Sequence, residues 1–120
     1  MAYGLFLTLD QRKWRADDYS SDNGLTGTVY TDEKKTIAKN LTGYTVNVLI
    51  YKRWSNAILF WKAATIVTAA SGTWKYLVKK GEMVSPGLYF VEIELNKSGV
   101  VESTEPEELL VQYSPYVGEQ

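Results

Sequence analysis

Residues 41–51, which read Leu-Thr-Gly-Tyr-Thr-Val-Asn-Val-Leu-Ile-Tyr, predict a half-buried β-strand. The stretch opens with a Thr-Gly turn, and apolar and polar side chains then alternate along it. One set is Val46, Val48 and Ile50, and the other set is Thr45, Asn47 and Tyr51. Leu49 interrupts the alternation, which indicates that the outer face is partly covered as well. Because burial of each inward side chain contributes about 1.5–3 kcal/mol, we expect this to be the central strand of the main sheet.

The composition is that of one globular domain. The chain has 120 residues, of which 45% are hydrophobic and 22% are charged, and a chain near this size buries about two-thirds of its unfolded surface. Its apolar runs are too short to cross a bilayer, and residues 1–10 lack the basic start and long apolar core of a secretory signal. We therefore expect a soluble chain without membrane contact that is not exported by a signal peptide.

The sequence contains no cysteine and no histidine. It therefore offers no disulfide, no thiolate nucleophile and no thiolate metal ligand. It also lacks the commonest general base and the nitrogen ligand that zinc favours. We expect a protein that is not an enzyme and that holds no metal and no cofactor.

Several further segments have the composition of short strands. They lie at residues 3–9, 25–30, 57–70, 74–78, 89–95, 100–101 and 109–113, and turn formers separate them. The alanines within 57–70 are also compatible with a helix, but the β-branched and aromatic residues around them favour strands. We expect a pair of short strands there, with a kink near residues 62–64.

About seven to nine short strands, with turn signals every 8–12 residues or so, are typical of an antiparallel sandwich or barrel. We predict an all-β fold, an immunoglobulin-like antiparallel β-sandwich without the disulfide, with Trp74 or Tyr89 between the sheets. The expected divisions are an N-terminal arm or edge strand at 1–20, the sandwich at 21–113 and a tail at 114–120.

The order of the turn and strand motifs resembles a known family. The motifs are Asp-Glu-Lys-Lys at 32–35, Asn-Leu-Thr-Gly-Tyr-Thr-Val at 40–46, Ser-Gly-Thr-Trp-Lys-Tyr at 71–76 and Ser-Pro-Gly-Leu-Tyr-Phe-Val-Glu-Ile at 85–93. Over residues 24–113 this succession is similar to the N-terminal domain of phage baseplate upper proteins and to related phage immunoglobulin-like domains. The chain departs from the family at Asn40, where aspartate is usual, and in its aromatic opening, residues 3–14.

The resemblance implies a structural role in a virion. The expected function is that of a non-enzymatic baseplate or tail protein or a capsid decoration protein, made in the cytoplasm of the bacterial host. Its expected partners are other virion proteins and further copies of itself in a homo-oligomer or multi-copy assembly. The alternative is a carbohydrate-binding module that attaches the particle to a host glycan.

Aromatic side chains supply the candidate interface, since large aromatics are enriched in interface cores. The candidates are Tyr3, Phe6, Trp14, Tyr51, Trp54, Phe60 and Trp61. Three interpretations of the residues near 51–61 stay open: a core strand, a subunit interface and a platform for stacking sugars. The opening segment is expected to pack either on its own domain or on a neighbour, because its apolar surface would otherwise be exposed.

Charge is divided unevenly along the chain. Residues 1–91 carry a net charge of +5 and residues 92–120 a net charge of −6, which together give −1. The division reflects either chance or an acidic surface that meets a basic surface on another copy. The basic cluster at 12–15 is too small to predict nucleic-acid binding. The acids at 17–24 lack the spacing of a calcium loop, and the glutamates at 92–108 favour a solvated face over a catalytic pair.

Overall fold

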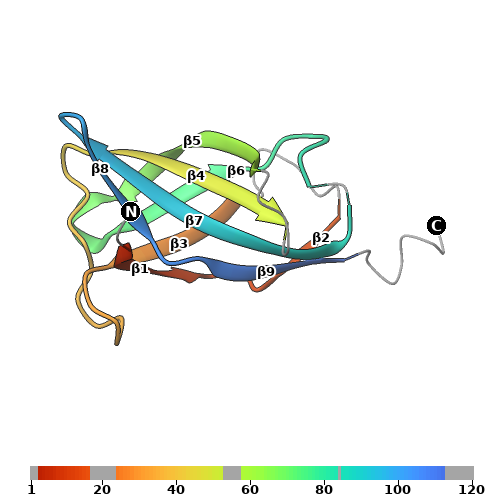
Figure 1. Ribbon diagram of the computed structural model, residues 1–120, viewed down its shortest axis with the longest axis horizontal. Helices are drawn as coiled ribbons and strands as arrows, with labels where there is room; N and C mark the ends of the chain where they lie inside the picture. Colours follow the sequence, from red (N-terminus) through yellow and green to blue (C-terminus); the bar gives the residue numbers. More distant parts are fainter. Residues whose placement is uncertain (1–2, 17–23, 53–57, 84, 113–120) are drawn as a thin grey trace.

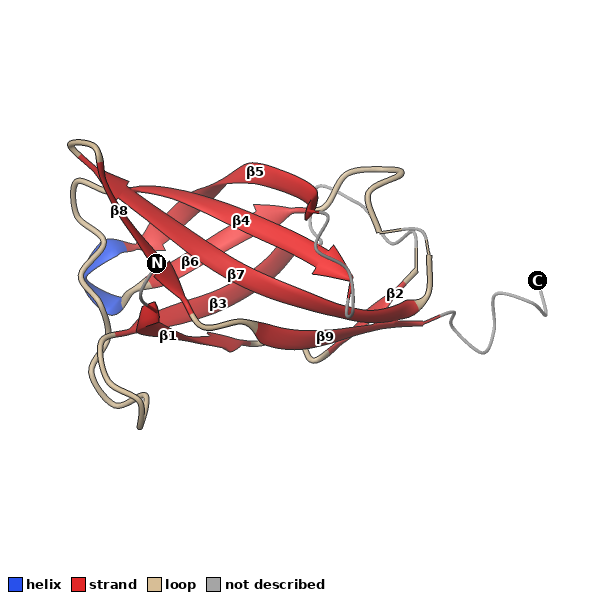
Figure 2. Ribbon diagram, in the orientation of Figure 1, coloured by secondary structure: helices blue, strands red, loops and turns tan. Residues whose placement is uncertain are grey.

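The computed structural model describes residues 3–16, 24–52, 58–83 and 85–112, with Tyr3 and Ile58 described by their backbone alone. These residues form nine strands (Figures 1 and 2). The strands are β1 Tyr3–Leu9, β2 Lys13–Arg15, β3 Gly24–Tyr30, β4 Thr45–Lys52, β5 Ile58–Thr68, β6 Thr73–Leu77, β7 Gly87–Lys97, β8 Val100–Thr104 and β9 Glu107–Gln112, and the 3₁₀ turn η1 Ala69–Ser71 lies between β5 and β6. The prediction of an all-β fold is confirmed.

Seven of the strands close into a barrel. Around the ring the order is β7-β4-β5-β6-β3-β1-β8, and β8 pairs back onto β7. β9 continues beside the first half of β7, and β2 pairs with β9. The predicted immunoglobulin-like sandwich is therefore not confirmed, because a sandwich keeps two sheets apart, whereas here hydrogen-bonded strands join them on both sides.

The strand β5 makes one of these two joins. The pair of short strands expected here is wrong: residues 58–68 form one strand of 11 residues. Its first part pairs with β4, where Val46 lies opposite Ala64, and its last part pairs with β6, where Thr65 lies opposite Lys75. A register shift between Ile66 and Thr68 replaces the expected kink. The strand therefore passes from one side of the barrel to the other without a break.

The first strand, β1, makes the second join. Its start pairs in parallel with β8, where Tyr3 lies opposite Ser103, and its remainder pairs antiparallel with β3. The chain then crosses to β2, which runs parallel to β9. The segment expected to be an arm or edge strand thus contributes β1 to the barrel wall and β2 to its flank.

The core fills the interior of the barrel. Val46, Val48 and Ile50 are buried, as the alternation predicts, and β4 lies between β5 and β7. Trp74 and Tyr89, the two aromatics expected inside, are 0% and 1% exposed. The other large side chains that are almost fully buried are Leu7, Leu25, Leu41, Met83, Ile93, Leu95 and Leu109. Inward residues of β1, β3, β4, β6, β7 and β9 therefore share one core.

Gly27 on β3 lies at a tightly packed point of the barrel wall. A Cβ built there would collide with the backbone oxygen of Thr8 on β1 and lie 2.8 Å from Cζ2 of Trp74. Backbone cannot move aside cheaply, and Trp74 is itself fixed in the core. The glycine therefore lets β1 and the indole ring approach β3 together.

We predict that Gly27→Ala lowers the free energy of unfolding by about 3 kcal/mol, because the added methyl group overpacks the site. Urea denaturation measures the change. Gly4→Ala is the matched control on β1, since a Cβ there meets nothing within 4 Å, and it should change stability by no more than about 1 kcal/mol. Equal effects from the two substitutions would contradict this account of the packing.

Candidate interaction surface

The structure separates the seven aromatic candidates. Trp14 is 6% exposed and belongs to the core. Phe60 is half-buried and points inward, with its ring centroid 5.8 Å from that of Tyr76. Phe6 lies on the far side of the barrel at a small cavity. Trp54 and the side chain of Tyr3 lie outside the described residues, so Tyr51 and Trp61 are the candidates left on the outer side of β4 and β5.

Tyr51 and Trp61 are part of a larger apolar surface on the outside of β4, β5, β7 and β9. This surface, which we call the apolar band, consists of Leu49, Tyr51, Trp61, Leu88, Phe90 and Leu110. In register, Trp61 lies opposite Leu49, Tyr51 opposite Phe90 and Leu88 opposite Leu110. The band therefore runs diagonally across four neighbouring strands.

The side chains of the band differ in how much they expose. Trp61 is 57% exposed and Leu110 is 36% exposed, whereas the others are half-buried. The rings of Tyr51 and Phe90 pack at a centroid distance of 5.6 Å and an interplanar angle of 45°, a tilted arrangement within the range that aromatic pairs prefer. This pairing gives the middle of the band a fixed shape, with the indole of Trp61 projecting at one end.

Carboxylates border the band. On β7, Glu92 lies opposite Leu49, and Glu94 follows on the same face. On β9, Glu108 lies opposite Phe90. An apolar centre with a polar rim is the usual composition of a protein–protein interface.

Four residues of the band were not among the predicted interface residues: Leu49, for which only an interruption of the alternation was noted, and Leu88, Phe90 and Leu110. A signal for Phe90 was present, because the alternation that buries Tyr89 and Val91 places Phe90 on the same face as Glu92. Leu110 has no comparable signal, since its place beside Leu88 depends on the pairing of β7 with β9.

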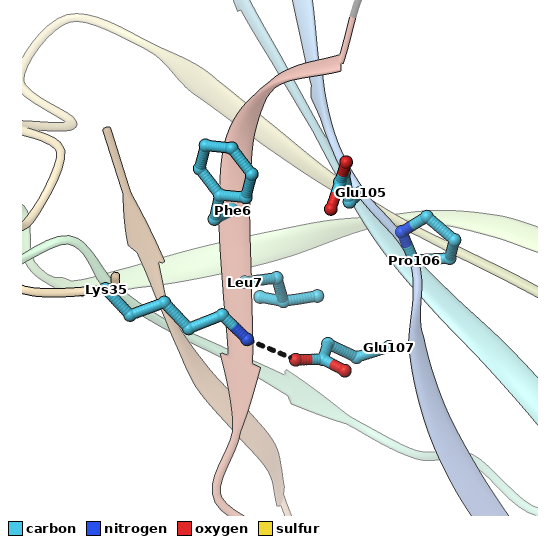
Figure 3. A pocket seen from close by; sticks show the side chains of 6 residues that line it. All are labelled: Phe6, Leu7, Lys35, Glu105, Pro106 and Glu107. Atoms are coloured by element: carbon cyan, nitrogen blue, oxygen red, sulfur yellow. Dashed lines mark hydrogen bonds and ion pairs between the residues drawn. The ribbon is translucent and has the colours of Figure 1, made fainter. Parts of the chain in front are cut away.

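A cavity of about 140 Å³ lies where β1 and β9 separate (Figure 3). Phe6, Leu7, Lys35, Glu105, Pro106 and Glu107 line it. Lys35 Nζ reaches across β1 to within 2.5 Å of Glu107 Oε1, so one of the two carboxylates at the cavity, that of Glu107, is engaged in an ion pair. This arrangement fastens the loop between β3 and β4 to β9 and offers little for chemistry.

A second, more open cavity of about 360 Å³ lies at one end of the barrel, lined by Lys52, Leu59, Gly81, Glu82, Ser85 and Tyr89. The Tyr76 hydroxyl donates to the Glu82 carboxylate at 2.7 Å. Burial raises the pKa of Tyr76, and the hydrogen bond to Glu82 and its negative charge raise that pKa further. Burial also raises the pKa of Tyr89, whose hydroxyl donates to the backbone oxygen of Ser85. These contacts hold the chain after β6 against the barrel.

Within the described residues, no group of three or more acidic side chains is arranged to hold a metal ion. None of the helical segments described is long and apolar enough to span a membrane. The chain matches no protein-family model, and a search of curated proteins found no similar sequence. The apolar band is therefore the surface feature with the clearest chemical character.

We predict that Tyr76→Phe makes stability less sensitive to alkaline pH. A folded-state pKa raised above 10.0 gives a stability contribution that is complete below the unfolded pKa and is lost as pH rises above it. The free energy of unfolding of the wild type should thus change little up to about pH 9.5 and fall progressively from there to about pH 12, and Tyr76→Phe should flatten this fall. Urea denaturation over this range measures both slopes.

Glu82→Gln provides the second arm of this experiment. It keeps the tyrosine and its burial but removes the negative charge, so it should flatten the slope only in part. Three identical slopes would show that Tyr76 does not titrate differently in the folded and unfolded chains.

Proposed function

We propose that this chain is a non-enzymatic structural protein of a phage virion, either baseplate- or tail-associated or a capsid decoration. It docks onto other virion proteins through the apolar band. The observation that supports docking most directly is the exposure of Trp61 at the end of a continuous apolar surface with a carboxylate rim. The virion setting is supported by the order of motifs between residues 24 and 113.

The band has the physical properties of a docking surface. Tryptophan and tyrosine dominate the binding energy of many interfaces because they bury much area with few rotatable bonds. Here both side chains lie on strands of a closed barrel, so little backbone ordering accompanies binding. A partner that covers Trp61 and Leu49 would remove their apolar surface from water. Each Å² removed in this way contributes about 25 cal/mol of favourable free energy.

A second candidate function is glycan binding for host attachment. The observation that favours it is the exposed indole of Trp61, close to carboxylate and amide groups. Glu92 and Asn47 both lie on the outer face beside the Trp61–Leu49 pair. An exposed ring offers a stacking platform for a pyranose, and the polar groups would bind its hydroxyls.

We predict that Trp61→Ser removes the chain from the particle. Quantitative mass spectrometry of purified particles, taken from the virus that encodes the chain, should find several copies of the wild-type chain per particle. The copy number of Trp61→Ser should be at least about tenfold lower. Val67→Ser is the matched control, because Val67 lies on the same strand and is 59% exposed but is outside the band. It should leave the copy number unchanged.

The result that overturns the proposal is absence of the wild-type chain from purified particles. A glycan array separates the second candidate, since saturable binding by the wild type that Trp61→Ser abolishes would favour host attachment. Equal incorporation of Trp61→Ser and Val67→Ser would show that docking does not use the band.

A further inference from the structure

The strand β5 has a neighbour on both sides over only part of its length. On one side it pairs with β4 from Ile58 to Ala64, and on the other side it pairs with β6 at Thr65, Ile66 and Thr68. Among the described residues, none pairs with residues 59–63 on the side that faces away from β4. The ladder between β5 and β6 is therefore open along the first half of β5.

Backbone groups of Trp61 and Ala63 point into this opening. The Ile93 N–H donates to a side-chain oxygen on β8, so it faces away from β4, and Val48 opposite it must direct its own N–H and C=O toward β5. There Val48 lies opposite Lys62, so the backbone of Lys62 bonds to β4. Because these directions alternate along a strand, Trp61 and Ala63 direct their N–H and C=O groups to the other side.

The strand β6 leads to the same directions independently. Both backbone groups of Thr26 on β3 bond to residues 10–11 after β1, so they face away from β6. Lys75 opposite Thr26 must therefore face β5, where it lies opposite Thr65. Thr65 then faces away from β4, and Trp61, four residues earlier on the same strand, faces the same way.

This part of β5 is accessible to water on both of its faces. Trp61 is 57% exposed, and Lys62 and Ala63 are exposed as well, although successive side chains of a strand point to opposite faces. Leu77, the last residue of β6, is also exposed. Free N–H and C=O groups on an accessible strand edge can bond to a further strand and continue the sheet.

The open edge is complementary to itself. With a second copy placed antiparallel and Trp61 opposite its own counterpart, the two residues exchange both backbone hydrogen bonds. Leu59 of each copy then lies opposite Ala63 of the other, so the outer face of the pair is apolar. On the inner face Lys62 of each copy lies opposite Phe60 of the other, and contact of an ammonium group with an aromatic ring is favourable.

The charge of Lys62 also disfavours the neighbouring arrangement. Pairing centred on Lys62 would place two like charges directly opposite each other, which destabilises a strand pair. Pairing centred on Trp61 avoids this contact and needs no acidic partner. A second copy thus satisfies the backbone groups of the edge without leaving a charge against a charge of the same sign.

A second copy also extends the apolar band. In one molecule Trp61 lies at the end of the band, opposite Leu49. Pairing of two copies would bring their indoles together at the centre of a doubled band, and tryptophans at such central positions carry much of the binding energy of interfaces. The contact is isologous, so it closes on two copies and leaves neither edge open.

We infer that two copies of this chain form a symmetric dimer by antiparallel pairing of β5 with β5 along residues 59–63. The dimer deepens the proposed function, on which its setting in a virion rests, by naming a second copy as a partner. It presents one continuous apolar surface to the particle in place of two separate ones.

Ala63→Pro tests the pairing at the backbone. Proline removes the N–H that points into the opening and fills the space beside it, whereas the bonds to β4 are made by other residues. In sedimentation equilibrium the wild type should have twice the monomer mass of 13.6 kDa, and Ala63→Pro should have the monomer mass. Ala63→Ser is the matched control, since it keeps the N–H, and it should remain a dimer. An unchanged far-UV circular dichroism spectrum shows that Ala63→Pro is folded.

Disulfide cross-linking tests the register and keeps Trp61 in place. The sequence contains no cysteine, so Leu59→Cys and Ala63→Cys each carry a single thiol. In the dimer the two positions lie opposite each other, with Cα atoms about 5.5 Å apart, a distance that a disulfide spans. An equimolar mixture of the two variants should form covalent dimers under mild oxidation at least about tenfold faster than either variant alone. Each variant alone is the control, because its two thiols lie four residues apart along the strands.

Three results would overturn the inference. They are a wild type that is monomeric over the whole concentration range, a folded Ala63→Pro that keeps twice the monomer mass, and a mixture that cross-links no faster than the single variants. A monomeric wild type that is nevertheless present in purified particles would refute the dimer and leave the proposed function intact. Dimerisation of a chain absent from particles would do the reverse.

Discussion

The seam between the two ends of the chain is the contact on which the barrel depends. Its first hydrogen bond joins the Glu105 backbone N–H to the Leu5 carbonyl at 3.0 Å, beside the parallel pairing of β1 with β8. Farther along, Leu110 N–H donates to the Arg12 carbonyl and Ala16 N–H donates to the Gln112 carbonyl. Between these two groups the strands separate, and the Lys35–Glu107 ion pair bridges the opening. Without this seam, β1 and β8 would both present unpaired backbone edges.

Closure at the seam also determines what can be buried. Leu5, Leu7 and Leu9 point into the barrel and are at most 6% exposed. They can be buried there only because β1 is held between β3 and β8. The backbone pairing at the seam and the hydrophobic core therefore stabilise each other, which is the cooperativity expected of a single domain of this size.

Much of the local structure could be predicted from the sequence. Alternation identified the central strand and its inward residues, because one face of a strand in a barrel wall is buried and the other is not. The unbroken strand β5 could not be predicted in this way. Lys62, Ala63 and Ala64 have low strand propensity, but pairing with β4 overrides that propensity. The choice between a sandwich and a barrel rests on two connections, the passage of β5 from β4 to β6 and the parallel pairing of β1 with β8. The sequence has no local signal for the second.

The candidate surface shows the same limit. Tyr51 and Trp61 could be identified because they stand out within one stretch, whereas Leu110 joins them only through the pairing of distant strands. Trp14 was placed on the surface because β2, with only three residues, is too short to show alternation.

A closed ring limits the ways in which such a protein can associate. Each of its seven strands has a neighbour on both sides, so adding a partner's strand to the ring is excluded over the paired residues. Contacts with a partner at these paired residues of the ring strands then use side chains on the outer wall, where an exposed indole, an apolar band and a carboxylate rim are available. Side chains on the wall contribute little to the core, so their identity is free to specify a partner while the barrel stays the same. A rigid wall with chemically distinct sides is therefore well suited to a structural component that must meet neighbours in a fixed orientation.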